Sequence, residues 1–196
     1  MMKKLLTLLN TEPNETEVRL FLKSYPDIVL SSFTPMGGHS EYVLTEFPLG
    51  IHYRADFVIP YSFSGEWVVH FIELEPVNDP IFTRAGVPSK RFNSAISQIN
   101  DWAEYIKKNR NQIKQDLADW CIKHDLLGTY DDGEPCNFTG NFLRNPNSFT
   151  TFKYHIVIGR RNRVNEECRR KMNQYQDFTN INIRTYDRFV DIENKL

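Results

Sequence analysis

The sequence contains few cysteines, no long hydrophobic run and no internal repeat. Its three cysteines, Cys121, Cys136 and Cys168, are widely spaced and form no C-x-x-C pair, so the pattern indicates neither a disulfide framework nor a zinc cluster. The apolar run in MMKKLLTLLN is shorter than the hydrophobic region of a secretory signal, and no small-residue cleavage site follows it. No stretch approaches the length of a membrane span. We therefore expect a cytoplasmic protein without membrane contact.

A large excess of charge of either sign is also missing. The formal net charge is −1 over 196 residues, with 40% hydrophobic and 25% charged residues, and this composition predicts one folded domain over residues 1–196 with its own core. The balance argues against a generally basic nucleic-acid-binding protein. From Thr151 to the end, however, ten Lys or Arg residues outnumber six Asp or Glu. These basic residues either face phosphates or form the solvated side of a surface helix, and both interpretations stay open.

Hydrophobic periodicity and turn residues predict helices and strands in mixed order, which is typical of an α/β fold. Asn14 precedes ETEVRLFLKSYP as an N-cap, and Pro26 follows the last turn of that helix. A Pro- and Gly-containing loop is predicted over 77–90 and a long polar loop over about 128–150. Strands are predicted within 41–60 (two), 65–76, 152–159 and 181–186, and helices within 1–12, 15–26, 92–109, 112–128, 164–176 and 187–196.

Three acidic residues interrupt otherwise apolar strand patterns. In FIELEP, Glu73 and Glu75 share one face of the predicted strand while Leu74 points to the other face, and Asp56 has a similar apolar setting in ADFVIP. An unpaired buried carboxylate costs several kcal/mol, so acids on a buried face require a cation or hydrogen-bond donors beside them. A divalent metal meets this requirement. The alternative is that the acids lie on the solvated side of a half-exposed strand.

The order of these elements resembles the PD-(D/E)xK nuclease superfamily, and within it the nuclease domain of the Shedu anti-phage defence proteins. The resemblance is carried by an acidic strand, a covering loop and an A-x-x-Q-x-x-D-W helix in that order, and it extends from the first helix almost to the end of the chain. It implies a restriction-endonuclease-like mixed sheet flanked by helices. The matching segments are DFVI (56–59), FIELEP (71–76), AISQINDWAEY (95–105), IVIGR (156–160) and TYD (185–187).

The resemblance also implies a metal-dependent chemistry. Asp56 and Glu73 would ligate Mg²⁺ or Mn²⁺, which prefer oxygen ligands, and the metal would activate a water for attack on the scissile phosphate. Gln98 would hydrogen-bond that water or a phosphate. A glutamate of the first capped helix would complete the metal's surroundings, and the spacing favours Glu15 over Glu17 only slightly.

Glu75 departs from the superfamily pattern, which has Lys at this position. A carboxylate cannot supply the positive charge of Lys, but E-x-E sites occur in some restriction endonucleases of the superfamily, where the second Glu serves as a base or a metal ligand. Glu75 therefore either takes that role or marks a site that has lost turnover.

These inferences predict a metal-dependent DNA endonuclease acting in anti-phage defence. One alternative is an inactive nuclease-fold module that binds DNA ends or a partner subunit, and another is an interaction scaffold in which the acids are solvated. Shedu relatives commonly carry an additional N-terminal sensing domain, so we expect self-association or a sensing partner subunit. The basic residues expected to contact DNA are Lys90, Arg91, Arg160 and Arg161.

Overall fold

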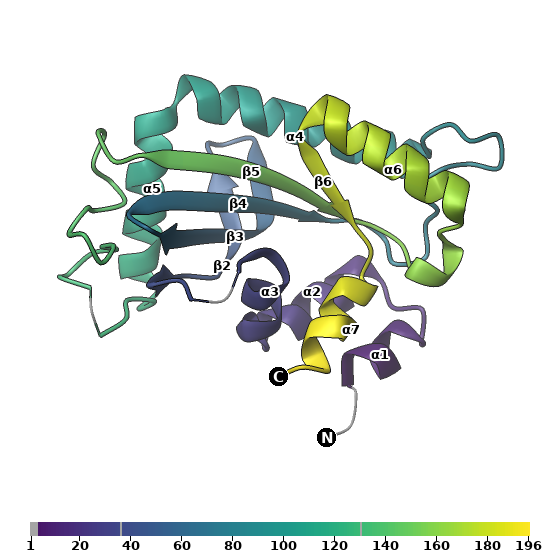
Figure 1. The fold of residues 1–196 in the computed structure, drawn as a ribbon, viewed down its shortest axis with the longest axis horizontal. Helices are drawn as coiled ribbons and strands as arrows, with labels where there is room; N and C mark the ends of the chain where they lie inside the picture. The colour runs from purple at the N-terminus through teal and green to yellow at the C-terminus, as the bar shows by residue number, and fades with distance from the viewer. Residues whose placement is uncertain (1–3, 36, 130) are drawn as a thin grey trace. The chain divides into compact units, whose positions relative to one another are not determined.

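A computed structural model of the chain describes residues 4–35, 37–129 and 131–196 (Figure 1). These residues form an α/β fold with a mixed six-stranded sheet flanked by helices, as the sequence predicts. This architecture is consistent with a restriction-endonuclease-like core. The strand order is β1-β3-β4-β5-β6, and β2 also pairs with β3. The helices are α1 (Lys4–Leu9), α2 (Glu15–Lys23), α3 (Pro26–Phe33), α4 (Lys90–Lys108), α5 (Arg110–Lys123), α6 (Glu166–Thr179) and α7 (Asp187–Glu193), with a 3₁₀ turn at Arg161–Arg163. The strands are β1 (Ser40–Glu41), β2 (Leu44–Leu49), β3 (Tyr53–Phe63), β4 (Glu66–Leu74), β5 (Thr150–Val157) and β6 (Ile181–Arg184).

The chain divides into two compact units, and α4, β4 and β5 each contribute residues to both. The first unit comprises Met1–Ser32, Ile72–Asn100 and Tyr154–Leu196. The second comprises Phe33–Phe71 and Asp101–Lys153.

In the second unit, β1 and β2 pair antiparallel with β3, which turns directly into β4. Ser64 and Gly65 form the turn, and both adopt positive φ, the conformation that a tight two-residue hairpin requires. Trp67 and Phe47 are fully buried, and the ring of Phe47 packs edge-on against Trp120 of α5. Apolar positions of the strands and of α5 thus form the core of this unit.

The long loop predicted near 128–150 lies in the second unit between α5 and β5, and its described residues contain one isolated bridge, Cys136↔Phe142. Asn137 is buried and organises the loop. Its side-chain oxygen accepts hydrogen bonds from the backbone N–H groups of Thr139 and Asn141, and its amide donates to the carbonyl of Gly65 at 2.9 Å. Side-chain hydrogen bonds therefore satisfy backbone groups that a sheet or helix would otherwise pair.

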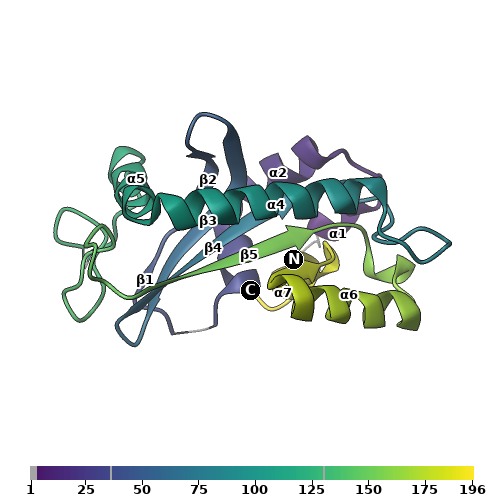
Figure 2. The same ribbon diagram turned by 90° about the horizontal axis from the view of Figure 1, so that it is seen from above.

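In the first unit, β5 and β6 pair in parallel and are connected through α6, which contacts β6 (Figures 1 and 2). Helix α7 follows β6 and contacts α1, where the backbone N–H of Leu5 donates to the carboxylate of Glu193. Helix α2 begins at the predicted cap: Asn14 accepts from the N–H of Glu17, and the Glu17 carboxylate accepts from the N–H of Asn14.

Several predicted boundaries differ from the structure, among them the end of α6, which continues to Thr179 instead of ending at 176. The N-terminal helix was expected over 1–12, but its described part ends at Leu9, and residues 1–3 lie outside the described residues. The segment after Tyr25 forms α3, because Pro26 begins a helix there instead of ending one. Strand β3 continues past Ile59 to Phe63, because Pro60 lacks an N–H but its carbonyl still accepts from Tyr42 at 3.0 Å.

None of the helices in the described ranges combines the length and the apolar character needed to cross a membrane.

Candidate functional site

The first unit brings together two of the predicted site residues, Glu73 on β4 and Gln98 on α4. The Gln98 side-chain amide donates a hydrogen bond to Oε1 of Glu73 at 2.7 Å. Gln98 lies at the edge of the α4 apolar stripe, whose members Ala95, Ile99 and Trp102 are fully buried. Because that stripe fixes the rotation of the helix, the half-buried Gln98 is held beside the strand, and its amide orients the carboxylate.

Glu75 follows two residues later, just beyond the last residue of β4. Its side chain is only 7% exposed, so this acid is not on a solvated face. Its backbone N–H donates to the carbonyl of Val157 at 2.8 Å, and its carbonyl accepts from the hydroxyl of Tyr186 at 2.7 Å. The segment that carries the two glutamates is therefore fastened on both sides, by β5 and by the start of α7.

Tyr186 is a site-supporting residue whose role the sequence did not predict. It is fully buried, and its N–H donates to the carbonyl of Gly159 while its hydroxyl reaches Glu75. The motif TYD contributed to the family resemblance, but nothing in its letters indicates a hydrogen bond to a residue 111 positions away in the sequence.

Asp56 belongs to the second unit, in the middle of β3. It is 6% exposed, and its neighbours Ala55 and Phe57 are fully buried. Asp56 and Glu75 are thus buried carboxylates, which contradicts the scaffold interpretation in which the acids are solvated. Buried carboxylates persist only with hydrogen bonds or opposite charge to stabilise them.

The structure gives different roles to the two first-helix glutamates. The carboxylate of Glu17 accepts the N–H of Asn14 at 2.8 Å and so belongs to the capping box. Glu15 is half-buried in the same first turn. A capping role thus accounts for Glu17, and the metal-ligand hypothesis stays with Glu15.

The side chains fit a hard divalent cation in the chemistry of their donors. Glu73, Glu75 and Gln98 offer carboxylate and amide oxygens, the ligand types that Mg²⁺ prefers. Within the described ranges, no group of three or more His, Cys, Asp or Glu residues is arranged to hold a metal ion. Mg²⁺ commonly binds only one or two protein carboxylates and completes its coordination shell with water and substrate phosphates. The glutamates of this segment are therefore compatible with Mg²⁺.

His70, on β4 within the second unit, does not act as a cationic acid at neutral pH. Burial, and secondarily the positive charge of Lys153, lower the pKa of His70 to about 4, so its imidazole is neutral. Its side chain is 3% exposed and belongs to the interior of that unit.

The four predicted DNA-contacting residues have different surroundings. Arg160 is paired with Asp187 and its side chain is only 11% exposed, whereas Arg161 pairs with Asp191 at the surface. Arg91 lies 3.9 Å from the carboxylate of Asp79. Lys90 is exposed at the first position of α4. Arg160 therefore has a structural partner that a phosphate would have to replace or share, and Lys90 is the more accessible cation.

Comparison with known proteins identifies one family. Residues 12–190 match the family model described as Shedu protein SduA, C-terminal. No curated protein matches the chain.

Proposed function

The chain belongs to the Shedu family, which suggests anti-phage defence, and we propose that it acts there as a metal-dependent DNA endonuclease. The observation that supports this proposal best is the Glu73 carboxylate held by the Gln98 amide at 2.7 Å. A carboxylate with a fixed orientation is preorganised as a metal ligand, because binding the metal then costs little side-chain conformational entropy.

In this proposal, Glu73 holds Mg²⁺ or Mn²⁺ together with one further carboxylate, for which Asp56 and Glu15 are the candidates. When bound, the ion would supply an activated water and stabilise negative charge on the phosphoryl oxygens. Gln98 fixes the orientation of Glu73. The hydrogen bond from the Tyr186 hydroxyl to the carbonyl of Glu75, called the Tyr186 clamp below, holds the backbone at Glu75 in position when a charged substrate binds.

Glu75 takes the position where the superfamily has Lys, and we assign it the role of base or additional ligand. Its burial supports a role inside the site, since a solvated glutamate would need no special surroundings. The alternative function is a module that binds DNA without cleaving it. The observation that favours this alternative is the missing lysine, because neither Glu73 nor Glu75 supplies a positive charge.

The deciding experiment is cleavage of linear, supercoiled and single-stranded DNA by the purified chain in Mg²⁺, Mn²⁺ or EDTA. We expect cleavage that requires metal and that is lost in Asp56→Asn and Glu73→Gln. Glu104→Gln is the matched control, because Glu104 is an exposed α4 acid paired with Lys108.

Glu75→Lys separates the two roles of this position. If the wild-type chain cleaves DNA and Glu75→Lys does not, Glu75 is required for cleavage. If the wild-type chain does not cleave and Glu75→Lys does, turnover was lost with the lysine. DNA binding without cleavage under any condition would overturn the nuclease proposal in favour of the binding module.

A further inference from the structure

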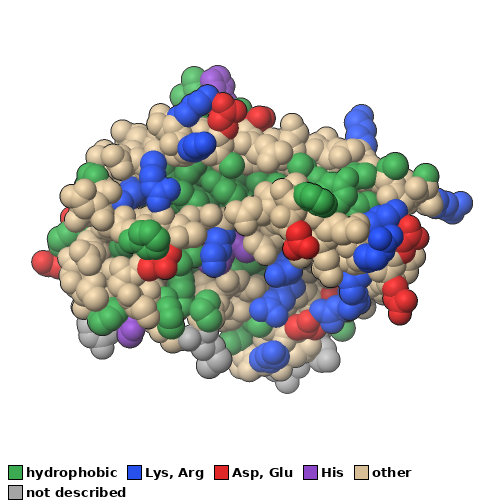
Figure 3. Space-filling model, turned by 45° about the horizontal axis from the view of Figure 1, so that its top comes forward, with side chains coloured by type: hydrophobic (Ala, Val, Ile, Leu, Met, Phe, Trp, Pro, Cys, Tyr) green, Lys and Arg blue, Asp and Glu red, His purple; other side chains and the backbone are tan. Residues whose placement is uncertain are grey.

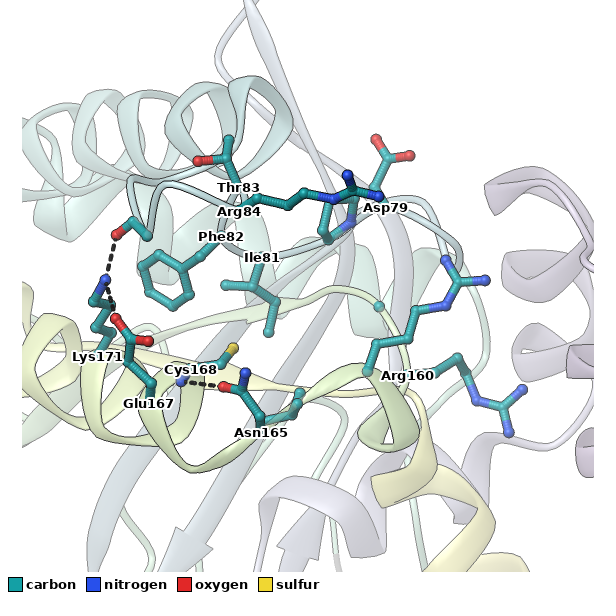
Figure 4. A pocket seen from close by; sticks show the side chains of 15 residues that line it. Asp79, Ile81, Phe82, Thr83, Arg84, Arg160, Asn165, Glu167, Cys168 and Lys171 are labelled. Carbon is teal, nitrogen blue, oxygen red and sulfur yellow. Dashed lines mark hydrogen bonds and ion pairs between the residues drawn. The ribbon is translucent and has the colours of Figure 1, made fainter.

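A basic pocket lies in the first unit between the 79–86 loop and the beginning of α6 (Figure 4). Its volume is about 240 Å³. Pockets for drug-sized ligands usually measure about 300–1,000 Å³, so this one suits a small group such as a phosphate with part of its sugar. Figure 2 shows the loop projecting beyond the N-terminal end of α4, alongside α6.

The charges of the lining favour an anion. Four basic residues and two acidic residues line the pocket, and both acids already face a cation. Glu167 pairs with Lys171 at 2.9 Å, and Asp79 lies near Arg91. The acids are therefore largely compensated. Among the arginines, Arg160 is paired with Asp187 and Arg163 lies 3.8 Å from the carboxylate of Glu12, so Arg84 supplies the uncompensated positive charge of the lining. In Figure 4, Lys171 and Glu167 lie at one end, Arg84 and Arg160 lie toward the other, and Ile81 and Phe82 are between them.

Arg84 is the cation best placed to bind a ligand. It is exposed and makes no hydrogen bond or ion pair with any residue that the structure describes. The other cations are partly engaged: Lys171 donates to the carbonyl of Gly86, and Arg163 to that of Asn78. Because a guanidinium presents several donors in a plane, Arg84 can bind two phosphate oxygens at once.

The pocket is also near the proposed catalytic segment along the chain. Asp79 follows Glu75 by four residues, so their Cα atoms are at most about 14 Å apart. The N–H of Gly159, a lining residue, donates to the carbonyl of Pro76 at 3.3 Å, and this hydrogen bond connects the pocket lining to the segment after Glu75. Successive phosphates of one strand advance by about 3.4 Å along a DNA helix axis, so a strand at Glu73 reaches this pocket within a few nucleotides.

We propose that this pocket, through Arg84, binds a backbone phosphate of the DNA strand that runs past Glu73. The assignment rests on the proposed nuclease function for its substrate, but its test does not require cleavage. Arg84 therefore positions the substrate and takes no part in the chemistry.

The test is binding of fluorescein-labelled 20-nucleotide single strands and duplexes to the full chain in EDTA, measured by fluorescence anisotropy. We expect Arg84→Glu to raise Kd at least about tenfold and to reduce the slope of log Kd against log salt by about one. Arg169→Glu is the matched control, because Arg169 is an exposed arginine of α6 outside the pocket lining. We expect it to change Kd less than about threefold.

The outcomes separate this proposal from the nuclease proposal. Equal affinities for Arg84→Glu and Arg169→Glu would overturn the pocket assignment, even if Glu73→Gln abolishes cleavage. Weaker binding by Arg84→Glu, with Glu73→Gln still cleaving normally, would keep the pocket and overturn the catalytic site.

A second measurement identifies the source of the phosphate. Thermal unfolding with AMP would show saturable stabilisation if the pocket binds free mononucleotides. If that stabilisation disappears in Arg84→Glu while DNA affinity stays at the wild-type value, the ligand is a mononucleotide and the DNA assignment is wrong. Arg84→Ala is measured in parallel, because it removes the cation without introducing a new charge.

Discussion

At the scale of single residues, one amide determines how the candidate site is held. Gln98 donates to Glu73, and the orientation of that carboxylate depends on this hydrogen bond. The motif A-x-x-Q-x-x-D-W predicted a role for Gln98, but the sequence could not identify its partner. A Gln at the edge of an apolar helical stripe has many possible acceptors until the helix is docked.

Gln98→Glu tests this dependence with almost no change in side-chain volume. The new carboxylate would repel Glu73 instead of donating to it, so we expect metal-dependent cleavage to fall by about 10- to 100-fold with the fold retained. Gln112→Glu is a close control, since Gln112 donates to Asp116 at 2.8 Å in the same way on the exposed side of α5. Equal cleavage by the two variants would show that the contact has no functional role.

At the scale of helices and strands, much of the fold follows from the sequence. The cap at Asn14 and the apolar stripe of α4 gave correct elements, because local hydrogen bonding and periodicity act within a few residues. The errors at α3 and at the end of β3 both involve proline. Pro26 and Pro60 each lack a donor, but neither position requires one, and this depends on which groups face the residue in the folded chain.

The basic pocket could not be predicted from the sequence either. Arg84 belongs to a loop without periodicity, and its relation to α6 arises only when Lys171 reaches the carbonyl of Gly86. The sequence pattern predicted DNA contacts at Arg160 and Arg161 instead. The charge of Arg160 is matched by Asp187, a partner that its own neighbours in the sequence do not reveal.

The long loop before β5 is the element whose order depends most on one side chain. Asn137→Ala removes acceptors for two backbone N–H groups and a donor to Gly65, so we expect a loss of about 1–3 kcal/mol in the free energy of unfolding. Cleavage by a protease between residues 128 and 150 should become faster at the same time. Asn147→Ala is the control, because Asn147 is exposed in the same loop. Similar proteolysis of both variants would show that Asn137 does not organise the loop.

At the scale of the whole molecule, charge is nearly balanced but locally uneven. The net charge is −1, yet Figure 3 shows Lys and Arg side chains in several groups on the visible face, with Asp and Glu among them. Many of these cations have acidic neighbours. Nonspecific attraction to DNA should therefore be weak, and affinity should depend on a few accessible cations.

Stability against acid is a property of the whole molecule to which His70 contributes. The folded pKa of about 4 lies below the unfolded value near 6.5, so the unfolded chain binds more protons between these values. The contribution of His70 is complete above pH 6.5 and is lost as pH falls toward 4, by up to about 3 kcal/mol.

Urea unfolding at pH 7.0, 6.0 and 5.5 measures this effect. We expect the free energy of unfolding of the wild-type chain to decrease over this series and that of His70→Gln to change less. His52→Gln, at an exposed position, should retain the wild-type pH dependence. An identical pH dependence for His70→Gln and the wild-type chain would contradict the conclusion that burial keeps the imidazole of His70 neutral.

The contact between α1 and α7 has a consequence for engineering the molecule. Because the N–H of Leu5 donates to the carboxylate of Glu193, the first and last helices that the structure describes lie next to each other, and a short linker can join Lys4 to Glu193. New ends could then be opened between Asp132 and Gly133, both exposed in the long loop. Such a circular permutant would keep the pairing of β5 with β6 while reversing the order in which the glutamate strand and its Tyr186 clamp leave the ribosome.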